Sequence, residues 1–294
     1  MQGLIGHSDD AIHALPMKIA VVALLTLASA SEVGVSAATE LPLWEAGAGV
    51  AVIDFPDYRG SDERRTYVLP VPYLVYRGEF LKADRNSVRG GIFSNDRLNL
   101  HVSINGSVPV SSDDNAARQG MPDLDATLEI GPTLEIHLQR SADARVQTDL
   151  RLPFRAAVAT NFQYVDSAGW VFDPRINVDV RDLWPGPGWN LGLATGPLFA
   201  NHRYHELFYG VRAEFATPQR AAYSAPGGYA GWQFLGAISK HYGAHWIGGF
   251  VRADTLSGAA FEASPLLKQK NYFAAGFAVA WIFDRSARTV EATE

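Results

Sequence analysis

The chain has 294 residues, of which 47% are hydrophobic and 19% are charged, and this composition excludes a disordered polymer. The formal net charge is -6 at pH 7 and no Lys/Arg-rich stretch is present, which argues against the basic face of a nucleic-acid-binding protein. Because the chain contains no cysteine, a disulfide framework, a thiolate zinc site, an iron–sulfur cluster and a cysteine nucleophile are all excluded.

The first segment along the chain has the pattern of a secretory signal peptide. Met17 and Lys18 precede an uncharged stretch, residues 19–30, and small residues then lead to Ala37 and Ala38. A positive start, a short apolar stretch and an A-x-A-like end are typical of a signal peptide, and the stretch is too short for a spanning helix. We predict that residues 1–37 are an N-terminal extension and signal peptide, with Met17 as a candidate true start. The alternative is a buried apolar helix.

The rest of the chain alternates between apolar and polar residues. Over residues 98–108 the even positions are mostly apolar and the odd positions are polar, and the pattern recurs over 124–138, 146–158 and 176–181. Because successive strand side chains point to opposite faces, each segment has one apolar and one polar face. The alternation over 124–138 is longer than a usual globular strand and favours a tilted membrane strand.

The last strand, residues 273–283, has apolar residues at every odd position and ends in Phe283. Such a terminal strand resembles the signal that the barrel-assembly machinery reads in outer-membrane proteins, so this machinery is an expected partner. We predict that residues 38–284 form the barrel and that residues 285–294 form a short C-terminal tail on the periplasmic side.

The connections between the predicted strands sort by length. The strands are predicted at about 44–54, 67–77, 80–93, 98–108, 124–138, 146–158, 176–181, 189–202, 229–241, 246–256 and 273–283. The connections 140–145, 183–188 and 242–245 are short, as periplasmic turns are, whereas 109–123, 161–168, 203–228 and 257–269 are longer and polar, as extracellular loops are. Closure into a barrel satisfies every backbone group in lipid, which an open sheet does not.

The strand count must be even if both chain ends lie in the periplasm. The eleven predicted segments therefore need one more strand. Either residues 78–93 hold a second hairpin around Arg85-Asn86-Ser87, or Glu206–Phe215 is a strand. A barrel of ten strands is the alternative if two N-terminal segments form a single strand. The predicted fold is an all-β, transmembrane, antiparallel up-and-down barrel of twelve strands, embedded in the lipid of a Gram-negative outer membrane. The alternative is a soluble periplasmic β-protein, which would have a polar outer face.

Prolines inside strands, such as Pro70, Pro72, Pro132 and Pro153, are expected at bulges or near strand ends.

Charged residues on the polar faces are the candidate functional residues of the lumen. The candidates are Glu129, Glu135, Asp149, Arg151, Arg155, Asp179 and Arg181. Rings of charged side chains set the selectivity of pores, so one hypothesis is a charged constriction that selects solutes. The other hypothesis is a set of salt-bridged side chains that fills a narrow barrel, and the mixed signs at similar depth favour it.

The histidines and serines show no clear catalytic or metal pattern. Ser103 lies two residues from His101 on the same polar face, but no nucleophile-elbow sequence surrounds it. His137 has no second histidine at ligand spacing, and a spaced pair such as His202 and His205 has no fixed geometry in a strand or loop. We therefore expect no catalytic residue, no cofactor and no metal site.

From Asp57 onward the sequence resembles the opening of the MipA/OmpV family of outer-membrane proteins. That opening is a Tyr-x-Gly-Ser-acidic turn, a proline-rich strand and an aromatic end. The matching residues are Tyr58, Gly60, Ser61, Asp62, Pro70, Pro72 and Tyr76. Residues 208–211 and 272–283 also fit, so the resemblance extends over essentially the whole mature chain and implies an outer-membrane location.

The resemblance also carries expectations about function. Some family members are described as scaffolds that link a lytic transglycosylase to a murein synthase, and others as porin-like or adhesive surface proteins. It therefore implies a non-enzymatic scaffold for these two murein-remodelling partners, or a surface or narrow channel protein, with no catalytic residue to transfer. The alternative is an outer-membrane enzyme acting on lipid or peptidoglycan, which requires a Ser/His/acid triple within hydrogen-bond reach on the barrel wall.

Overall fold

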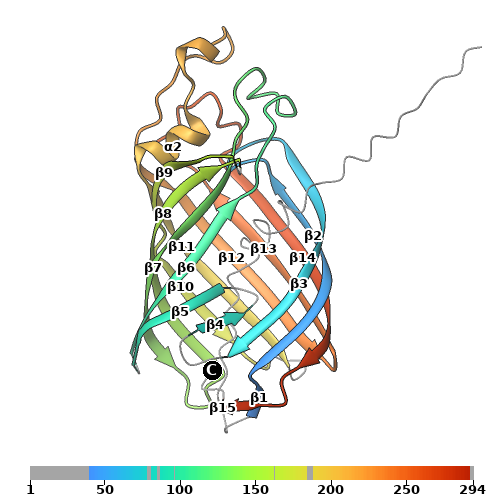
Figure 1. Cartoon of the computed structure of the whole chain (residues 1–294). Coiled ribbons are helices and arrows are strands. Elements are labelled where there is room, and N and C mark those ends of the chain that lie inside the picture. The colour runs from blue at the N-terminus through green and yellow to red at the C-terminus, as the bar shows by residue number, and fades with distance from the viewer. Residues whose placement is uncertain are drawn as a thin grey trace, which may run out of the picture.

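The computed structural model describes residues 40–77, 81–84, 87–95, 97–161, 163–183 and 188–291, and the predicted signal peptide lies outside them. These residues form antiparallel strands that surround a lumen (Figure 1). The strands are β1 (Glu40–Pro42), β2 (Trp44–Pro56), β3 (Arg64–Arg77), β4 (Leu81–Asp84), β5 (Ser87–Ser94), β6 (Leu98–Ser107), β7 (Ala126–Arg140), β8 (Val146–Thr160), β9 (Val165–Phe172), β10 (Arg175–Val180), β11 (Trp189–Ala200), β12 (Gly228–Tyr242), β13 (His245–Thr255), β14 (Asn271–Arg285) and β15 (Thr289–Glu291).

The strand pairings run round the barrel and return to their start. One sheet of thirteen strands has the order β10-β11-β12-β13-β14-β2-β3-β4-β5-β6-β7-β8-β9, and β10 also pairs with β8 while β11 also pairs with β9. β9 and β10 thus share one place between β8 and β11 and are separated by Asp173 and Pro174. Proline cannot donate to a ladder, which explains the break. Counted in this way, the described strands fill twelve places, the predicted number.

The twelfth strand comes from the segment predicted as 80–93. β4 ends at Asp84 and β5 begins at Ser87, so this segment is a hairpin, while Arg85 and Asn86 lie outside the described residues. The alternative strand over Glu206–Phe215 is wrong, because α2 (His202–Tyr209) and a 3-10 helix (Ala213–Phe215) occupy this region. Asn201 starts α2 by accepting a hydrogen bond from the Tyr204 backbone N–H, as a good N-cap residue does.

The apolar strand faces point outward and the polar faces point inward. On β14, Phe273, Phe277 and Phe283 are 53–60% exposed, whereas Ala278 on the opposite face is 3% exposed. Charged residues such as Glu129 are buried inside the ring. A soluble β-protein with a polar outer face is therefore excluded, and the predicted membrane barrel is confirmed.

The four strand prolines differ from the prediction. Pro132 and Pro153 lie in the middle of β7 and β8 and pair with Val102 and Thr133 without a register shift at either residue. Pro70 and Pro72 lie in the middle of β3 and pair with Val50 and Ala48 without a register shift, so placing them at bulges or strand ends was wrong. Within the described residues, β3 pairs with β4 only through residues 76 and 77. Over most of its length β3 thus has one paired neighbour, and the missing proline N–H groups interrupt no second ladder.

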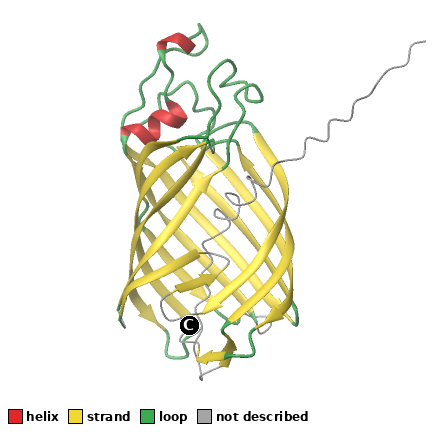
Figure 2. Ribbon diagram, in the orientation of Figure 1, coloured by secondary structure: helices red, strands yellow, loops and turns green. Residues whose placement is uncertain are grey.

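The two ends of the barrel differ. At one end lie short turns and the small sheet in which β1 pairs with β15, and we call it the turn end (Figure 1). At the other end, residues 57–63, 108–125, 201–227 and 256–270 fold over the opening, and we call these four segments the cap (Figure 2). Nowhere in the described part of the chain is a helix long and apolar enough to cross a membrane.

We predict that a charge on the outer face destabilises the barrel in a depth-dependent way. Phe277 lies near the middle of β14 and Phe283 near its end, and both side chains point outward. Phe277→Arg is expected to lower the free energy of unfolding by about 2–4 kcal/mol, and Phe283→Arg, the matched control near the interface, by about 0–1 kcal/mol. Urea unfolding in lipid vesicles measures both values. Equal losses at the two depths contradict a lipid-facing strand.

Candidate functional site

The lumen below the cap contains a cavity of about 270 Å³. Tyr204, His205 and Tyr209 of α2 line it from the cap side, and arginines and carboxylates of the strands line it from the barrel side. The charged side chains around this cavity form the candidate site.

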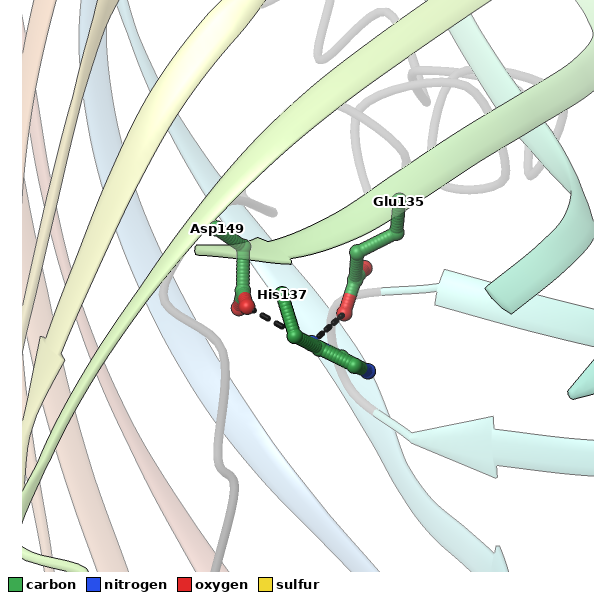
Figure 3. A group of neighbouring side chains, drawn as sticks. All are labelled: Glu135, His137 and Asp149. Carbon is green, nitrogen blue, oxygen red and sulfur yellow. Dashed lines mark hydrogen bonds and ion pairs between the residues drawn. The ribbon is translucent and has the colours of Figure 1, made fainter. Parts of the chain in front are cut away.

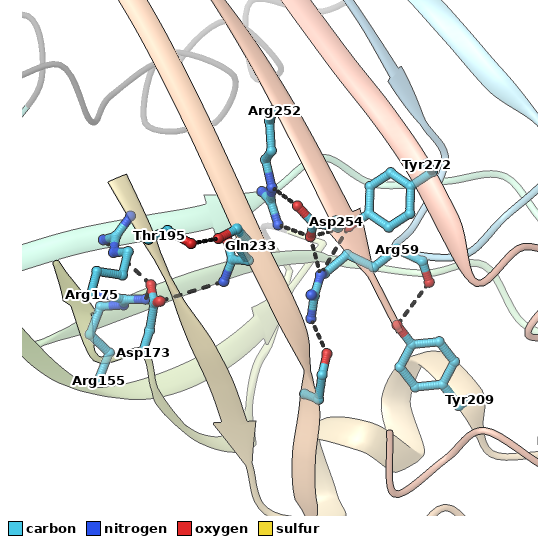
Figure 4. Close-up of polar contacts among 11 residues, drawn as sticks. Arg59, Arg155, Asp173, Arg175, Thr195, Tyr209, Gln233, Arg252, Asp254 and Tyr272 are labelled. Carbon is cyan, nitrogen blue, oxygen red and sulfur yellow. Dashed lines mark hydrogen bonds and ion pairs between the residues drawn. The ribbon is translucent and has the colours of Figure 1, made fainter. Parts of the chain in front are cut away.

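A first group of ion pairs lies on the cap side of the lumen, and we call it the cap-side cluster (Figure 4). Arg155 of β8 donates to Glu129 of β7 at 3.0 Å and to Asp173 at 3.3 Å, and the side chains of Arg155 and Glu129 are each 3% exposed. Arg175 of β10 lies 3.4 Å from the same Asp173 carboxylate, and Gln233 of β12 donates to it at 3.4 Å. The cluster therefore links β7, β8, β10 and β12 through their side chains.

The cap-side cluster lies where the backbone ladder is interrupted by prolines. Between β7 and β8 the pairing stops at Ile130 and resumes at Thr133, which leaves out Gly131 and Pro132. Between β9 and β10 it stops around Pro174, where Asp173 donates its backbone N–H to the Pro153 carbonyl at 3.2 Å. Side-chain ion pairs thus add contacts between strands where the backbone ladder is incomplete.

A second group, the turn-side cluster, lies nearer the turn end (Figure 3). Arg151 lies 3.0 Å from Glu135 and 3.8 Å from both Asp149 and Asp179. His137 Nδ1 is 2.7 Å from Asp149 Oδ1, so the imidazole bonds to a carboxylate that is fully buried. This cluster thus brings the three carboxylates together with the Arg151 guanidinium and the His137 imidazole.

The charged residues singled out from the sequence therefore lie in two groups. The structure brings Glu129 and Arg155 together in the cap-side cluster, and Glu135, Asp149, Arg151 and Asp179 in the turn-side cluster. Arg181 is half-buried just beyond β10, where its backbone N–H donates to the Arg145 carbonyl at 2.8 Å. Mutual pairing of opposite charges is the arrangement of the salt-bridged hypothesis rather than of an open charged constriction.

Further charged residues join the wall to the cap. Arg59 in the first cap segment donates to Asp254 of β13 at 2.9 Å and to the Tyr272 hydroxyl at 3.0 Å, and Arg252 donates to the same carboxylate at 2.7 Å (Figure 4). The Tyr209 hydroxyl of α2 donates to the Arg59 carbonyl at 2.8 Å. Arg252 and Asp254 are two residues apart in the strand predicted at 246–256, and this spacing places both side chains on one face.

The turn shared with the family motif organises the cap. The Tyr58 hydroxyl donates to the Leu266 carbonyl at 2.8 Å, and the Gly60 carbonyl accepts two backbone N–H groups of the segment 256–270. Gly60 has φ +87°, and a Cβ there would lie 2.3 Å from Leu267 Cδ1, so only glycine fits. The Ser61 hydroxyl accepts from Asn115 at 3.2 Å, which adds the segment 108–125.

The other motif residues lie at the surface. Asp62 is exposed in the turn, and Pro70, Pro72 and Tyr76 point outward from β3. The turn half of the motif thus has a structural role in the cap, while the strand half contributes to the outer face.

The enzyme alternative requires a serine within reach of a histidine. The Ser103 hydroxyl instead donates to the Gly131 carbonyl at 3.4 Å and accepts from Thr133 at 2.6 Å. Its hydrogen bonds therefore go to the neighbouring strand and not to an imidazole.

His205 of α2 is a neutral, buried histidine inside the cap. It is 1% exposed, its Nδ1 bonds to the Pro226 carbonyl at 2.6 Å, and its ring packs edge-on against Phe261. Burial lowers the pKa of His205 to about 4. The cap therefore contains an imidazole that resists protonation at neutral pH.

The chain is similar to known outer-membrane proteins. The family model described as "MltA-interacting protein MipA" matches residues 47–283. The protein named "Outer membrane protein OmpV" of Vibrio cholerae serotype O1 is 27% identical over 214 residues, which cover 71% of this chain and 76% of that protein. A solved outer membrane channel from Pseudomonas putida F1 has a TM-score of 0.41 and 11% identity, over 86% of this chain and all of that one. A bacterial polysaccharide outer membrane secretin has a TM-score of 0.41 and 8% identity, over 82% and 99%.

We predict that Arg155→Ala strongly destabilises the barrel, because it leaves the buried carboxylates of Glu129 and Asp173 without their cation. The expected loss is about 3–5 kcal/mol of unfolding free energy. Arg64→Ala is the matched control, since its ion pair with Asp54 is exposed and contributes at most about 1 kcal/mol. Urea titration of the heat-modifiable folded band compares the two. Similar losses for both variants contradict a stabilising role for the cap-side cluster.

We predict that acid loosens the cap. A histidine with an unfolded pKa near 6.5 and a folded pKa of about 4 takes up a proton more readily when the cap is open. The neutral, buried imidazole thus contributes about 3 kcal/mol to the free energy of opening the cap. This contribution is fully present above pH 6.5 and is lost as the pH falls towards 4. In hydrogen exchange, the protection factors of residues 202–209, which are the rates corrected for the intrinsic pH dependence of exchange, should therefore fall over this range. His205→Gln, which cannot protonate, should remove the pH dependence, and an unchanged profile in this variant contradicts the assignment.

Proposed function

Since the chain belongs to the MltA-interacting protein MipA family and is an outer-membrane protein, we propose that it is a non-enzymatic, closed barrel that serves as a scaffold for murein-remodelling enzymes. The observation that supports this proposal is the lumen itself. Its charged side chains pair with one another, and the cap folds over one end above a cavity of about 270 Å³. A barrel whose interior is used up in this way offers little room for the passage of solutes.

The proposed orientation places the cap outside the cell and the turn end in the periplasm. In bacterial barrels the short turns and both chain termini lie on the periplasmic side. The periplasmic surface then consists of the short turns and the paired strands β1 and β15. This surface is where a periplasmic lytic transglycosylase, and through it a murein synthase, would bind. The contacts of the Ser103 hydroxyl with Thr133 and Gly131 support a non-enzymatic role.

The scaffold proposal predicts direct binding of a lytic transglycosylase. Purified protein in detergent, immobilised through a tag in the cap loop 213–223, should retain purified lytic transglycosylase MltA, because the turn end stays free. Deleting residues 286–291 removes β15 and unpairs β1 but leaves the barrel strands intact, so this variant should bind more weakly. An unrelated porin, purified and immobilised in the same way, serves as the control. Retention no better than that of the porin contradicts the scaffold.

A further inference from the structure

The turn-side cluster contains three side chains with the chemistry of metal ligands. One carboxylate oxygen of Glu135, one of Asp149 and a ring nitrogen of His137 all lie within 4.8 Å of one another (Figure 3). We propose that these three residues bind a divalent first-row transition-metal cation, with Zn²⁺ as its representative. The sequence pattern did not indicate this site, because the ligands come from two strands and only one of them is a histidine.

The backbone register fixes the three ligands. Glu135 and His137 are two residues apart on β7, so both point to the inner face, and Asp149 of β8 is the direct cross-strand partner of His137. Directly opposed residues have Cβ atoms about 5 Å apart. The set is therefore held by a paired ladder and needs no loop to close around the ion.

The distances suit a small cation. His137 Nδ1 lies 2.7 Å from Asp149 Oδ1 and 3.9 Å from Glu135 Oε1. Zinc bound to nitrogen and oxygen at its usual lengths in a tetrahedral site separates two such ligands by about 3.3 Å. The two distances, 2.7 and 3.9 Å, become equal at about 3.3 Å when the imidazole moves by about 0.6 Å from Asp149 towards Glu135.

Arg151 occupies the other oxygens of the same carboxylates. It faces Glu135 through Oε2 and Asp149 through Oδ2, whereas Oε1 and Oδ1 are the atoms nearest the imidazole. Gln147 also donates to Asp149, at 3.0 Å to Oδ2 and 3.1 Å to Oδ1. Such outer contacts are the ones that orient ligating carboxylates in metal sites.

An unpartnered buried oxygen provides an independent sign of a ligand. Asn177 of β10 is 1% exposed, and its Oδ1 has no hydrogen-bond donor among the described residues. Asn177 is the cross-strand partner of Asp149 on the other edge of β8, so its side chain lies on the inner face next to that of Asp149. A buried carbonyl oxygen without a protein donor needs an ordered water or a cation, and a metal ion at the adjacent ligands supplies either itself or its bound water.

The mixture of ligands selects the class of cation. One imidazole nitrogen with carboxylate oxygens favours zinc and its first-row neighbours over Ca²⁺ and Mg²⁺, which take oxygen ligands alone. The His137 side chain is 29% exposed, so the ion can reach the site from the lumen and can keep a water or solute as a further ligand.

The test is zinc binding to the untagged barrel, because a polyhistidine tag would itself bind the metal. Protein purified from outer membranes is stripped with a chelator and titrated with Zn²⁺ against a chromophoric indicator. The wild type should bind one equivalent, His137→Ala should lose it, and Asp149→Asn should weaken it by about tenfold or more, since even outer contacts are worth that much. Co²⁺ should give visible absorption bands in the wild type that His137→Ala removes.

His241→Ala is the matched control, because His241 also faces the interior and bonds to the Tyr73 hydroxyl at 2.9 Å, away from the proposed ligands. It should keep the full equivalent of zinc. The boiled and unboiled gel mobility of each variant reports whether its barrel has folded, and Asp149→Asn keeps the side-chain shape if His137→Ala does not fold. The proposal is overturned if the wild type binds no zinc at micromolar concentration, or if folded His137→Ala and Asp149→Asn both bind as the wild type does.

Discussion

The pairing of opposite charges inside the ring is the interaction on which the rest of the structure depends. Strand periodicity places every second side chain in the lumen, and the lipid outside fixes which face this must be. A buried unpaired charge is costly. Arg151 and Arg155 each contact a carboxylate on a neighbouring strand, and Arg175 contacts Asp173 in the connection between β9 and β10. In the cap-side cluster these contacts replace backbone hydrogen bonds that Pro132 and Pro174 cannot make. The same pairing that stabilises the wall therefore lines the cavity below the cap.

The cap depends on the wall in the same way. Arg59 joins the first cap segment to Asp254 of β13, and Tyr204 of α2 donates to Glu129, which is itself paired with Arg155. The apolar part of the cap, with Tyr58, Tyr209 and Phe261, packs above these polar contacts. The cap is thus anchored to both sides of the ring, and the family-like turn at Tyr58 and Gly60 is the point where its segments meet.

The sequence was sufficient for the barrel and insufficient for the geometry of its interior. Alternation with period two identified the strands, the outward apolar face and six charged residues that meet inside, because these depend only on local pattern. It did not show that β9 extends the strand predicted at 176–181, since Asp173 and Pro174 interrupt the pattern. Nor did it identify α2, whose start depends on Asn201. The contact of His137 with Asp149 depends on register between two strands, which no spacing along one strand reveals.

The most direct test of the closed lumen is single-channel conductance of the purified barrel in a planar lipid bilayer, with an open porin as the reference. Paired charges below an intact cap predict no stepwise conductance at neutral pH for a barrel that is folded by the heat-modifiability criterion. Regular, stepwise openings of the wild-type protein, comparable with those of the porin, would show that the ion-paired clusters line an open pore and would contradict this account.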